Sequence, residues 1–136
     1  MISTAGRWIA GQLAGDTDRY TSLYFGEAGI AWALYDAGCA VADAQLVERA
    51  LALAETLPVS AENPDLTHGT AGLGLTFLHF WLRTGHEQFA ERAAKAADEL
   101  AATAIIESVQ AGVGLLQDAA QQDGFKICHD QRPVTC

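Results

Sequence analysis

Two stretches of the chain place glycines directly before a long apolar run. In the clearer one, Gly69 and Gly72 precede Gly74 and a run that is apolar through residue 82 except for two polar side chains and one indole N–H. A run of about a dozen such residues that stops at Gly85 is longer than a typical buried strand. The pattern therefore predicts a buried helix over residues 71–84.

The same pattern occurs 43 residues earlier. Gly26 and Gly29 stand where the later copy has its first two glycines, and an apolar run follows them. This predicts a first buried helix over residues 28–37, ended by Gly38. A fixed period between such units is the signature of a repeat protein.

An amphipathic segment follows each buried helix. The first, over residues 43–57, has an apolar stripe on one face and stops before Pro58. The second covers residues 87–102. Six positions agree at the 43-residue offset, pairing Gln45, Glu48, Arg49, Ala50, Ala54 and Leu57 with Gln88, Glu91, Arg92, Ala93, Ala97 and Leu100. The repeating unit is thus an α-hairpin with an inner and an outer helix.

A third copy begins at residues 111–116, which align with residues 71–76 at an offset of 40. Gln and Asp side chains then interrupt its apolar run, and no outer helix is expected. Residues 4–13 predict a short lead-in helix before a polar turn at residues 15–19. The expected organisation is a lead-in over residues 1–21, about two and a half hairpins over residues 22–124, and an irregular tail over residues 125–136.

Composition narrows the possible functions. Half of the 136 residues are apolar, and the net charge of −9 disfavours nucleic acid and anionic membrane surfaces as partners. No uninterrupted apolar run approaches the ~18 residues of a membrane span. Three cysteines, Cys39, Cys128 and Cys136, are irregularly spaced and favour reduced thiols over a disulfide framework. We therefore expect a cytoplasmic protein.

Glycine motifs before buried helices, alternating with amphipathic helices, resemble the lanthionine synthetase C-like cyclase family. The segment His68-Gly-Thr-Ala-Gly72 is the most similar part, and residues 23–32 look like the opening of the cyclase portion of fused kinase-cyclase synthetases. The resemblance implies an all-α fold, an α/α-toroid in which outer helices surround a ring of inner helices. This chain supplies at most three inner helices, so we expect an incomplete ring.

The resemblance also implies a reaction and a partner. Cyclases of this family add a cysteine thiol of a lanthipeptide precursor to a dehydrated serine or threonine, which forms a thioether ring. Some members use zinc, held by one Cys and an adjacent Cys-His pair, to generate the thiolate. The alternative is a non-catalytic helical-repeat module that binds a peptide or protein. In either case the short chain is expected to be inactive alone and to self-associate through exposed inner helices.

His68 is the candidate catalytic residue, because it lies in the turn before an inner helix and an imidazole exchanges protons near neutral pH. Asp65 is a weaker candidate that could orient the imidazole or cap the helix. A purely structural role remains open for both. The structural glycine motif comprises Gly26, Gly29, Gly69, Gly72, Gly74, Gly112 and Gly114.

Other polar residues have simpler explanations. His79 lies inside an apolar helix and is expected to be a core histidine, while Glu27 complements a helix N-terminus. Cys128 and His129 are adjacent, as in the zinc pair, but Asp130 follows them instead of a glycine turn. No metal site is therefore expected. The glycines form no phosphate loop, because no Gly-Lys-Ser/Thr follows them.

Overall fold

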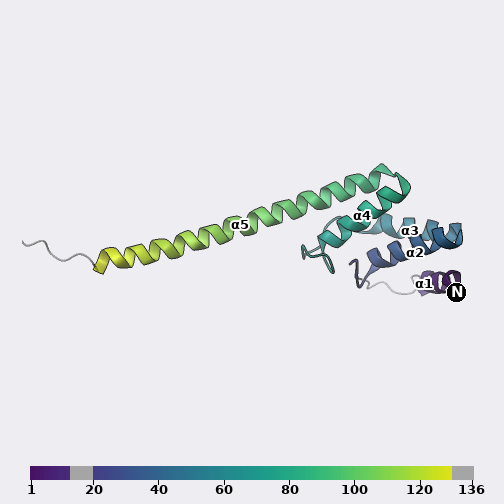
Figure 1. Ribbon diagram of the computed structural model, residues 1–136, viewed down its shortest axis with the longest axis horizontal. Helices are drawn as coiled ribbons and strands as arrows, with labels where there is room; N and C mark the ends of the chain where they lie inside the picture. The colour runs from purple at the N-terminus through teal and green to yellow at the C-terminus, as the bar shows by residue number, and fades with distance from the viewer. Residues whose placement is uncertain (13–19, 130–136) are drawn as a thin grey trace, which may run out of the picture. The chain divides into compact units, whose positions relative to one another are not determined.

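The computed structural model describes residues 1–12 and 20–129, and all of its regular elements are helices (Figure 1). They are α1 (Ile2–Gln12), α2 (Glu27–Val41), α3 (Ala44–Thr56), α4 (Thr70–Thr84) and α5 (Glu87–His129). The all-α class is thereby confirmed. The predicted polar turn at residues 15–19 and the end of the tail, residues 130–136, lie outside the described residues.

Helix boundaries agree with the sequence in the middle of the chain. Asp43 caps α3 by accepting hydrogen bonds from the backbone N–H groups of Gln45 and Leu46. Gly85 ends α4 in the left-handed conformation, with φ 72°. The predicted end of α2 at Gly38 is wrong. A Cβ on this buried glycine would lie 2.8 Å from Val47 Cγ2, so Gly38 permits close packing of α2 on α3 and does not end the helix.

The glycine motif has the same geometry in both hairpins. A Cβ on Gly26 would lie 2.0 Å from the carbonyl oxygen of Tyr20, and one on Gly69 would lie 2.0 Å from that of Asn63. The same two carbonyls accept hydrogen bonds from the first N–H groups of the helices, at 2.8 Å from Glu27 and 2.9 Å from Thr70. Backbone oxygens thus cap α2 and α4 where other helices use a side chain.

The third copy does not form this turn. We expected the outer helix to end at residue 102 and a new helix to begin near residue 111, but α5 runs unbroken through both. At the offset of 40, Val109 stands where Gly69 stands, and its Cβ has no place in such a turn. Gly112 and Gly114 have no neighbouring atom within 4 Å of an added Cβ. The expectation of an irregular tail is also wrong for residues 125–129, which are helical.

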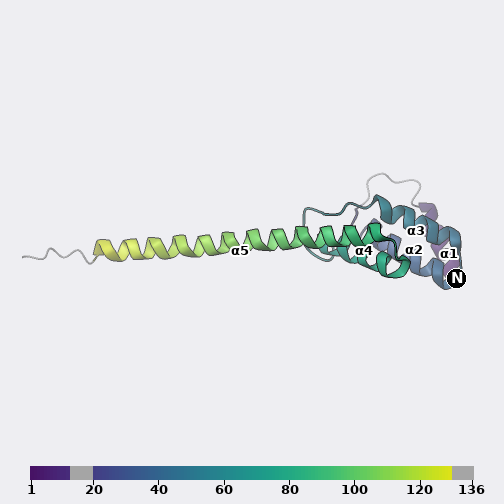
Figure 2. The same ribbon diagram turned by 90° about the horizontal axis from the view of Figure 1, so that it is seen from above.

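Helix α2 is central to the core, since it contacts α1, α3 and α4. Both views place α2 and α3 side by side (Figures 1 and 2). The first turns of α5 pack on α4 through Phe89, whose ring lies 5.3 Å from Phe80 and 6.5 Å from Phe77. Arg92 also joins the hairpins. Its guanidinium donates to the Ala54, Glu55 and Leu57 carbonyls at the end of α3 and lies over the Phe77 ring.

Residues 1–100 and 101–136 form separate compact units. The first contains the buried core: Ala10, Ala28, Ala31, Leu34, Tyr35, Leu46, Ala50, Ala54, Leu57, Leu73, Phe77, Phe80 and Phe89. In the second, Ile105, Ile106, Val109, Val113 and Leu115 are exposed. The functional argument below concerns the first unit.

Replacing Gly69 with Ala should destabilise the fold by at least about 2 kcal/mol, because the methyl group would overlap a backbone carbonyl that cannot move without uncapping α4. Gly11→Ala is the matched control, since an added Cβ there meets no atom within 4 Å and alanine favours the helix. Urea unfolding of both variants measures the difference. Equal stability would contradict the close approach at Gly69.

Candidate functional site

The two glycine turns lie against each other in front of α2 and α4. The backbone N–H of Tyr24 donates to the Thr67 carbonyl at 3.2 Å, and a Cβ on Gly72 would lie 3.0 Å from Leu23 Cβ. The Phe25 and His68 rings are stacked, with centroids 5.0 Å apart and planes within 9°. Phe25 and His68 are also equivalent in the repeat, 43 residues apart. The glycine turns of the two repeats therefore contact each other at the candidate residue His68.

The side chains of Asp65, Thr67 and His68 form a hydrogen-bonded group. Oδ1 of Asp65 accepts from the backbone N–H groups of Thr67 and His68 and from the Thr67 hydroxyl, each at 2.7 Å. The Thr67 hydroxyl lies 2.7 Å from His68 Nδ1. Asp65 Oδ1 is itself 3.7 Å from Nδ1. The His68 side chain is more than half exposed.

Asp65 has a structural role that the repeat makes visible. Its equivalent, Ser22, accepts from the backbone N–H of Phe25 at 3.2 Å, just as Asp65 accepts from that of His68. Both residues shape the turn through a local side chain to backbone bond. The backbone N–H of His68 and the Thr67 hydroxyl hold the pKa of the Asp65 carboxyl below its usual value. Asp65 therefore stays ionised beside His68 at neutral pH.

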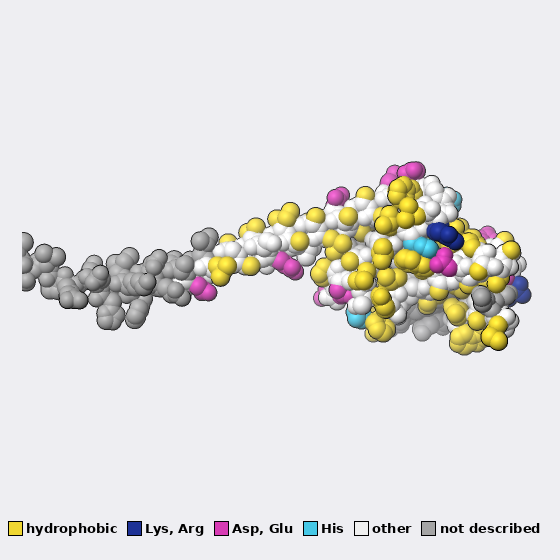
Figure 3. Space-filling view, in the orientation of Figure 1, with side chains coloured by type: hydrophobic (Ala, Val, Ile, Leu, Met, Phe, Trp, Pro, Cys, Tyr) yellow, Lys and Arg dark blue, Asp and Glu magenta, His cyan; other side chains and the backbone are white. Residues whose placement is uncertain are grey.

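A second polar cluster, which the sequence analysis missed, lies between α2 and α4. Trp32 Nε1 donates to Asp36 Oδ2 at 3.0 Å, and the Trp32 ring stacks on His79 at 3.9 Å. His79 Nε2 lies 3.3 Å from Asp36 Oδ1 without hydrogen-bond alignment, and Arg83 Nε lies 4.0 Å from the same oxygen. Figure 3 shows histidine, acidic and basic side chains adjoining one another among hydrophobic ones.

His79 is a core histidine in position but not a satisfied one. Its side chain is 13% exposed, and its Nε2 has no hydrogen-bond partner. Burial lowers the pKa of His79, and the nearby Asp36 carboxylate opposes this effect. The spacing of Asp36 and His79 in sequence, on two different helices, is not a recognisable motif.

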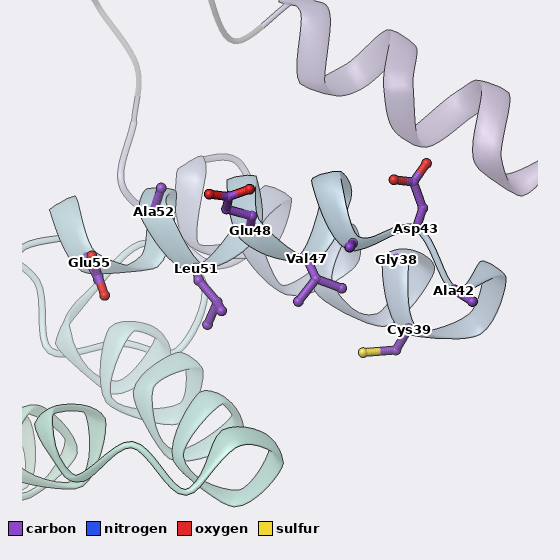
Figure 4. Close-up of a pocket in the computed structure, with 10 residues that line it drawn as sticks. Gly38, Cys39, Ala42, Asp43, Val47, Glu48, Leu51, Ala52 and Glu55 are labelled. Carbon is purple, nitrogen blue, oxygen red and sulfur yellow. The ribbon is translucent and has the colours of Figure 1, made fainter.

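A concavity of about 790 Å³ lies elsewhere, beside the turn between α2 and α3. Figure 4 shows Cys39, Val47 and Leu51 pointing to one side of it and Asp43 and Glu48 to the other. Its polar groups do not converge, and Asp43 is already occupied by the Arg7 guanidinium at 2.9 Å. This surface offers no reaction centre.

Among the side chains that the structure describes, no group of three or more His, Cys, Asp or Glu could hold a metal ion. The side chains of Cys128 and His129 lie outside that set. Cys39 is a free, exposed thiol on α2. Cys136 lies outside the described residues.

An apolar groove of about 590 Å³ runs between α4 and the start of α5. Its lining contains no charged side chain and consists of Leu66, Ala71, Gly74, Leu75, Leu78, Trp81, Ala90, Ala93, Ala94, Ala97 and Leu100. Leu66 lies between Asp65 and Thr67 in sequence, so one end of the groove adjoins the His68 turn. Among the described residues, no helix is long and apolar enough to cross a membrane.

Paired α-hairpins, each with a glycine turn before its inner helix, define a helical-repeat protein of the α/α-toroid kind. The sequence matches the family described as lanthionine synthetase C-like protein over residues 3–130, and the chain belongs to this family. No curated protein and no solved structure matches the sequence.

The pKa of His79 predicts a change of stability with pH. Because its folded value lies below the ordinary value of ~6.5, the unfolded chain takes up a proton first as the pH falls. The free energy of unfolding is therefore highest, as far as His79 is concerned, above pH ~6.5. It falls as the pH drops from ~6.5 toward the lower pKa of His79 in the folded protein. The charged or titratable groups near the ring are Asp36 and Tyr35 on α2 and Arg83 on α4.

Urea unfolding at pH 7.5 and 5.5 tests this prediction. We expect His79→Gln to reduce the loss of stability on acidification, and Asp36→Asn to enlarge it by removing the carboxylate that favours the imidazolium. His86→Gln, on an exposed histidine, is the control. An unchanged pH dependence in His79→Gln would contradict the prediction.

Proposed function

We propose that this chain forms part of a cyclase that adds cysteine thiols of a lanthipeptide precursor to dehydroalanine or dehydrobutyrine residues. Membership of the lanthionine synthetase C-like family supports the reaction class. The observation that carries the residue assignment is the His68 turn, in which an exposed imidazole is held by Thr67, Asp65 and the Phe25 ring.

Thioether formation requires two proton movements. The cysteine thiol must lose its proton, because the thiolate is the nucleophile. After sulfur adds to the β-carbon, the resulting enolate must gain a proton at the α-carbon. Neutral His68 can accept the first proton, and its protonated form can donate the second. Asp65 stabilises the imidazolium between the two steps, since its carboxylate lies 3.7 Å from Nδ1.

This chemistry indicates the class of substrate and the cellular compartment. The partner is a precursor peptide with dehydrated side chains and free cysteines, and the cytoplasm keeps such thiols reduced. We further propose a fused kinase-cyclase synthetase as the context, supported by the likeness of residues 23–32 to the opening of that type of cyclase portion. The alternative function, a non-catalytic peptide-binding repeat, differs in that it does not depend on proton transfer by His68.

Replacing His68 with Asn in a complete domain that carries residues 65–74 should slow cyclisation by about 100-fold or more, which is the usual contribution of a general acid or base. Precursor affinity should stay nearly unchanged, because Asn keeps a polar side chain. Mass spectrometry after thiol alkylation counts the cysteines that remain free. The 136-residue chain alone should leave them all open to alkylation.

His86→Asn is the matched control, since His86 is an exposed histidine in the turn after α4. Unchanged cyclisation by the His68→Asn domain would return His68 to a structural role. Absence of cyclisation by the unsubstituted complete domain would favour the peptide-binding alternative. Protection of precursor cysteines by the 136-residue chain alone would contradict the proposed need for a larger domain.

We also propose that the chain self-associates through the apolar groove. In the first hairpin the equivalent face is covered by α4: Tyr35, which corresponds to Leu78, is 7% exposed, whereas Leu78 is 38% exposed. A second copy of the chain, which presents equally uncharged apolar faces, is the proposed occupant. Covering such a face stabilises the assembly by roughly 25 cal/mol per Å² of apolar surface.

Leu78→Glu should shift the chain toward monomer, because it places a charge in the groove. Leu82→Glu is the control, since Leu82 is 69% exposed and lies outside the groove lining. Size exclusion with light scattering measures the mass, and a hydrophobic dye reports the open groove. A wild-type monomer that ignores the dye would overturn the proposal.

A further inference from the structure

Thr67 connects the two candidate residues of the site, although its sequence position alone gives no reason to single it out. Its hydroxyl lies 2.7 Å from Asp65 Oδ1 and 2.7 Å from His68 Nδ1. Its backbone N–H also donates to Asp65 Oδ1 at 2.7 Å. The Thr67 hydroxyl therefore lies between the Asp65 carboxylate and the His68 imidazole.

Counting protons fixes the direction of both hydroxyl contacts. Asp65 is ionised and can only accept, so the single Thr67 hydroxyl proton points to Oδ1. Nothing is then left on the hydroxyl to donate to Nδ1. The contact with His68 can be a hydrogen bond only if Nδ1 carries the proton and the hydroxyl oxygen accepts it.

We propose that Thr67 is a positioning residue that fixes His68 in the Nδ1–H tautomer and so makes Nε2 the atom that exchanges protons with substrate. The catalytic consequence of this assignment rests on the proposed role of His68 in cyclisation. The tautomer itself does not depend on that role. In the neutral ring Nε2 presents its lone pair, and in the protonated ring Nε2–H is the proton that leaves, because Nδ1–H remains bound to Thr67.

Phe25 cannot perform this selection. It stacks on the imidazole with planes within 9°, which fixes the plane of the ring. A 180° rotation about the Cβ–Cγ bond restores the same ring plane, and so keeps the stack, but exchanges the positions of the nitrogens and carbons. Only a directional partner such as the Thr67 hydroxyl distinguishes the two orientations.

Nitrogen-15 NMR of the imidazole in the 136-residue chain tests the assignment, with the His68 signals identified by their loss in His68→Gln. In the neutral ring, we expect Nδ1 to be protonated and Nε2 unprotonated. Thr67→Val removes the acceptor and should shift the tautomer ratio toward Nε2–H by about fivefold, which corresponds to one net hydrogen bond of about 1 kcal/mol. Thr67→Ser keeps the hydroxyl and should restore the wild-type ratio.

Thr56→Val is the control, because it removes a threonine hydroxyl that donates to the Leu53 carbonyl, away from the site. Protonated Nε2 in the wild type, or the same spectrum for Thr67→Val and Thr67→Ser, would overturn the assignment. The result is separable from the proposed function. If His68→Asn leaves cyclisation unchanged while the tautomer shift occurs as expected, the catalytic role fails and the Thr67 assignment stands.

Discussion

The structure depends on one close approach, that of a backbone carbonyl to the glycine that precedes each inner helix. The Tyr20 and Asn63 carbonyls lie where Gly26 and Gly69 would carry a Cβ, and they accept the first N–H groups of α2 and α4. One oxygen thus closes the loop and caps the helix. Every other residue type would push the loop away and leave the helix N-terminus without its acceptor.

The candidate site follows from this constraint. Because each loop folds tightly onto its own helix, the residue before the glycine projects at the outer edge of the turn. In the two copies these residues are Phe25 and His68, and packing of α2 against α4 brings them into a stack. The same turn position supplies Ser22 and Asp65 as acceptors for the following backbone. Two turns with similar backbone geometry therefore present different side chains, the aromatic ring of Phe25 and the imidazole of His68.

Sequence reasoning identified the features that depend on local pattern. The 43-residue period, the inner and outer helices and the end of α4 at Gly85 all follow from nearby residues. It failed where a glycine had a packing role, as at Gly38, and where two helices bring distant polar groups together, as with Asp36 and His79. It also missed Thr67, whose significance depends on the directions of two hydrogen bonds.

The unbroken course of α5 shows how strictly the turn depends on its residues. At the third copy, Val109 replaces the first glycine and Ile105 replaces the Asp65 acceptor, while Gly112 still matches Gly72. Together with Gly114, which matches Gly74, two glycines of the motif are retained. They are not sufficient, because the turn needs both the space at the first glycine and a side chain that accepts from the following backbone. Without them the alanine-rich segment keeps its helical hydrogen bonds, and α5 continues to His129. The repeat is thus defined by the turn and not by the apolar helix that follows it.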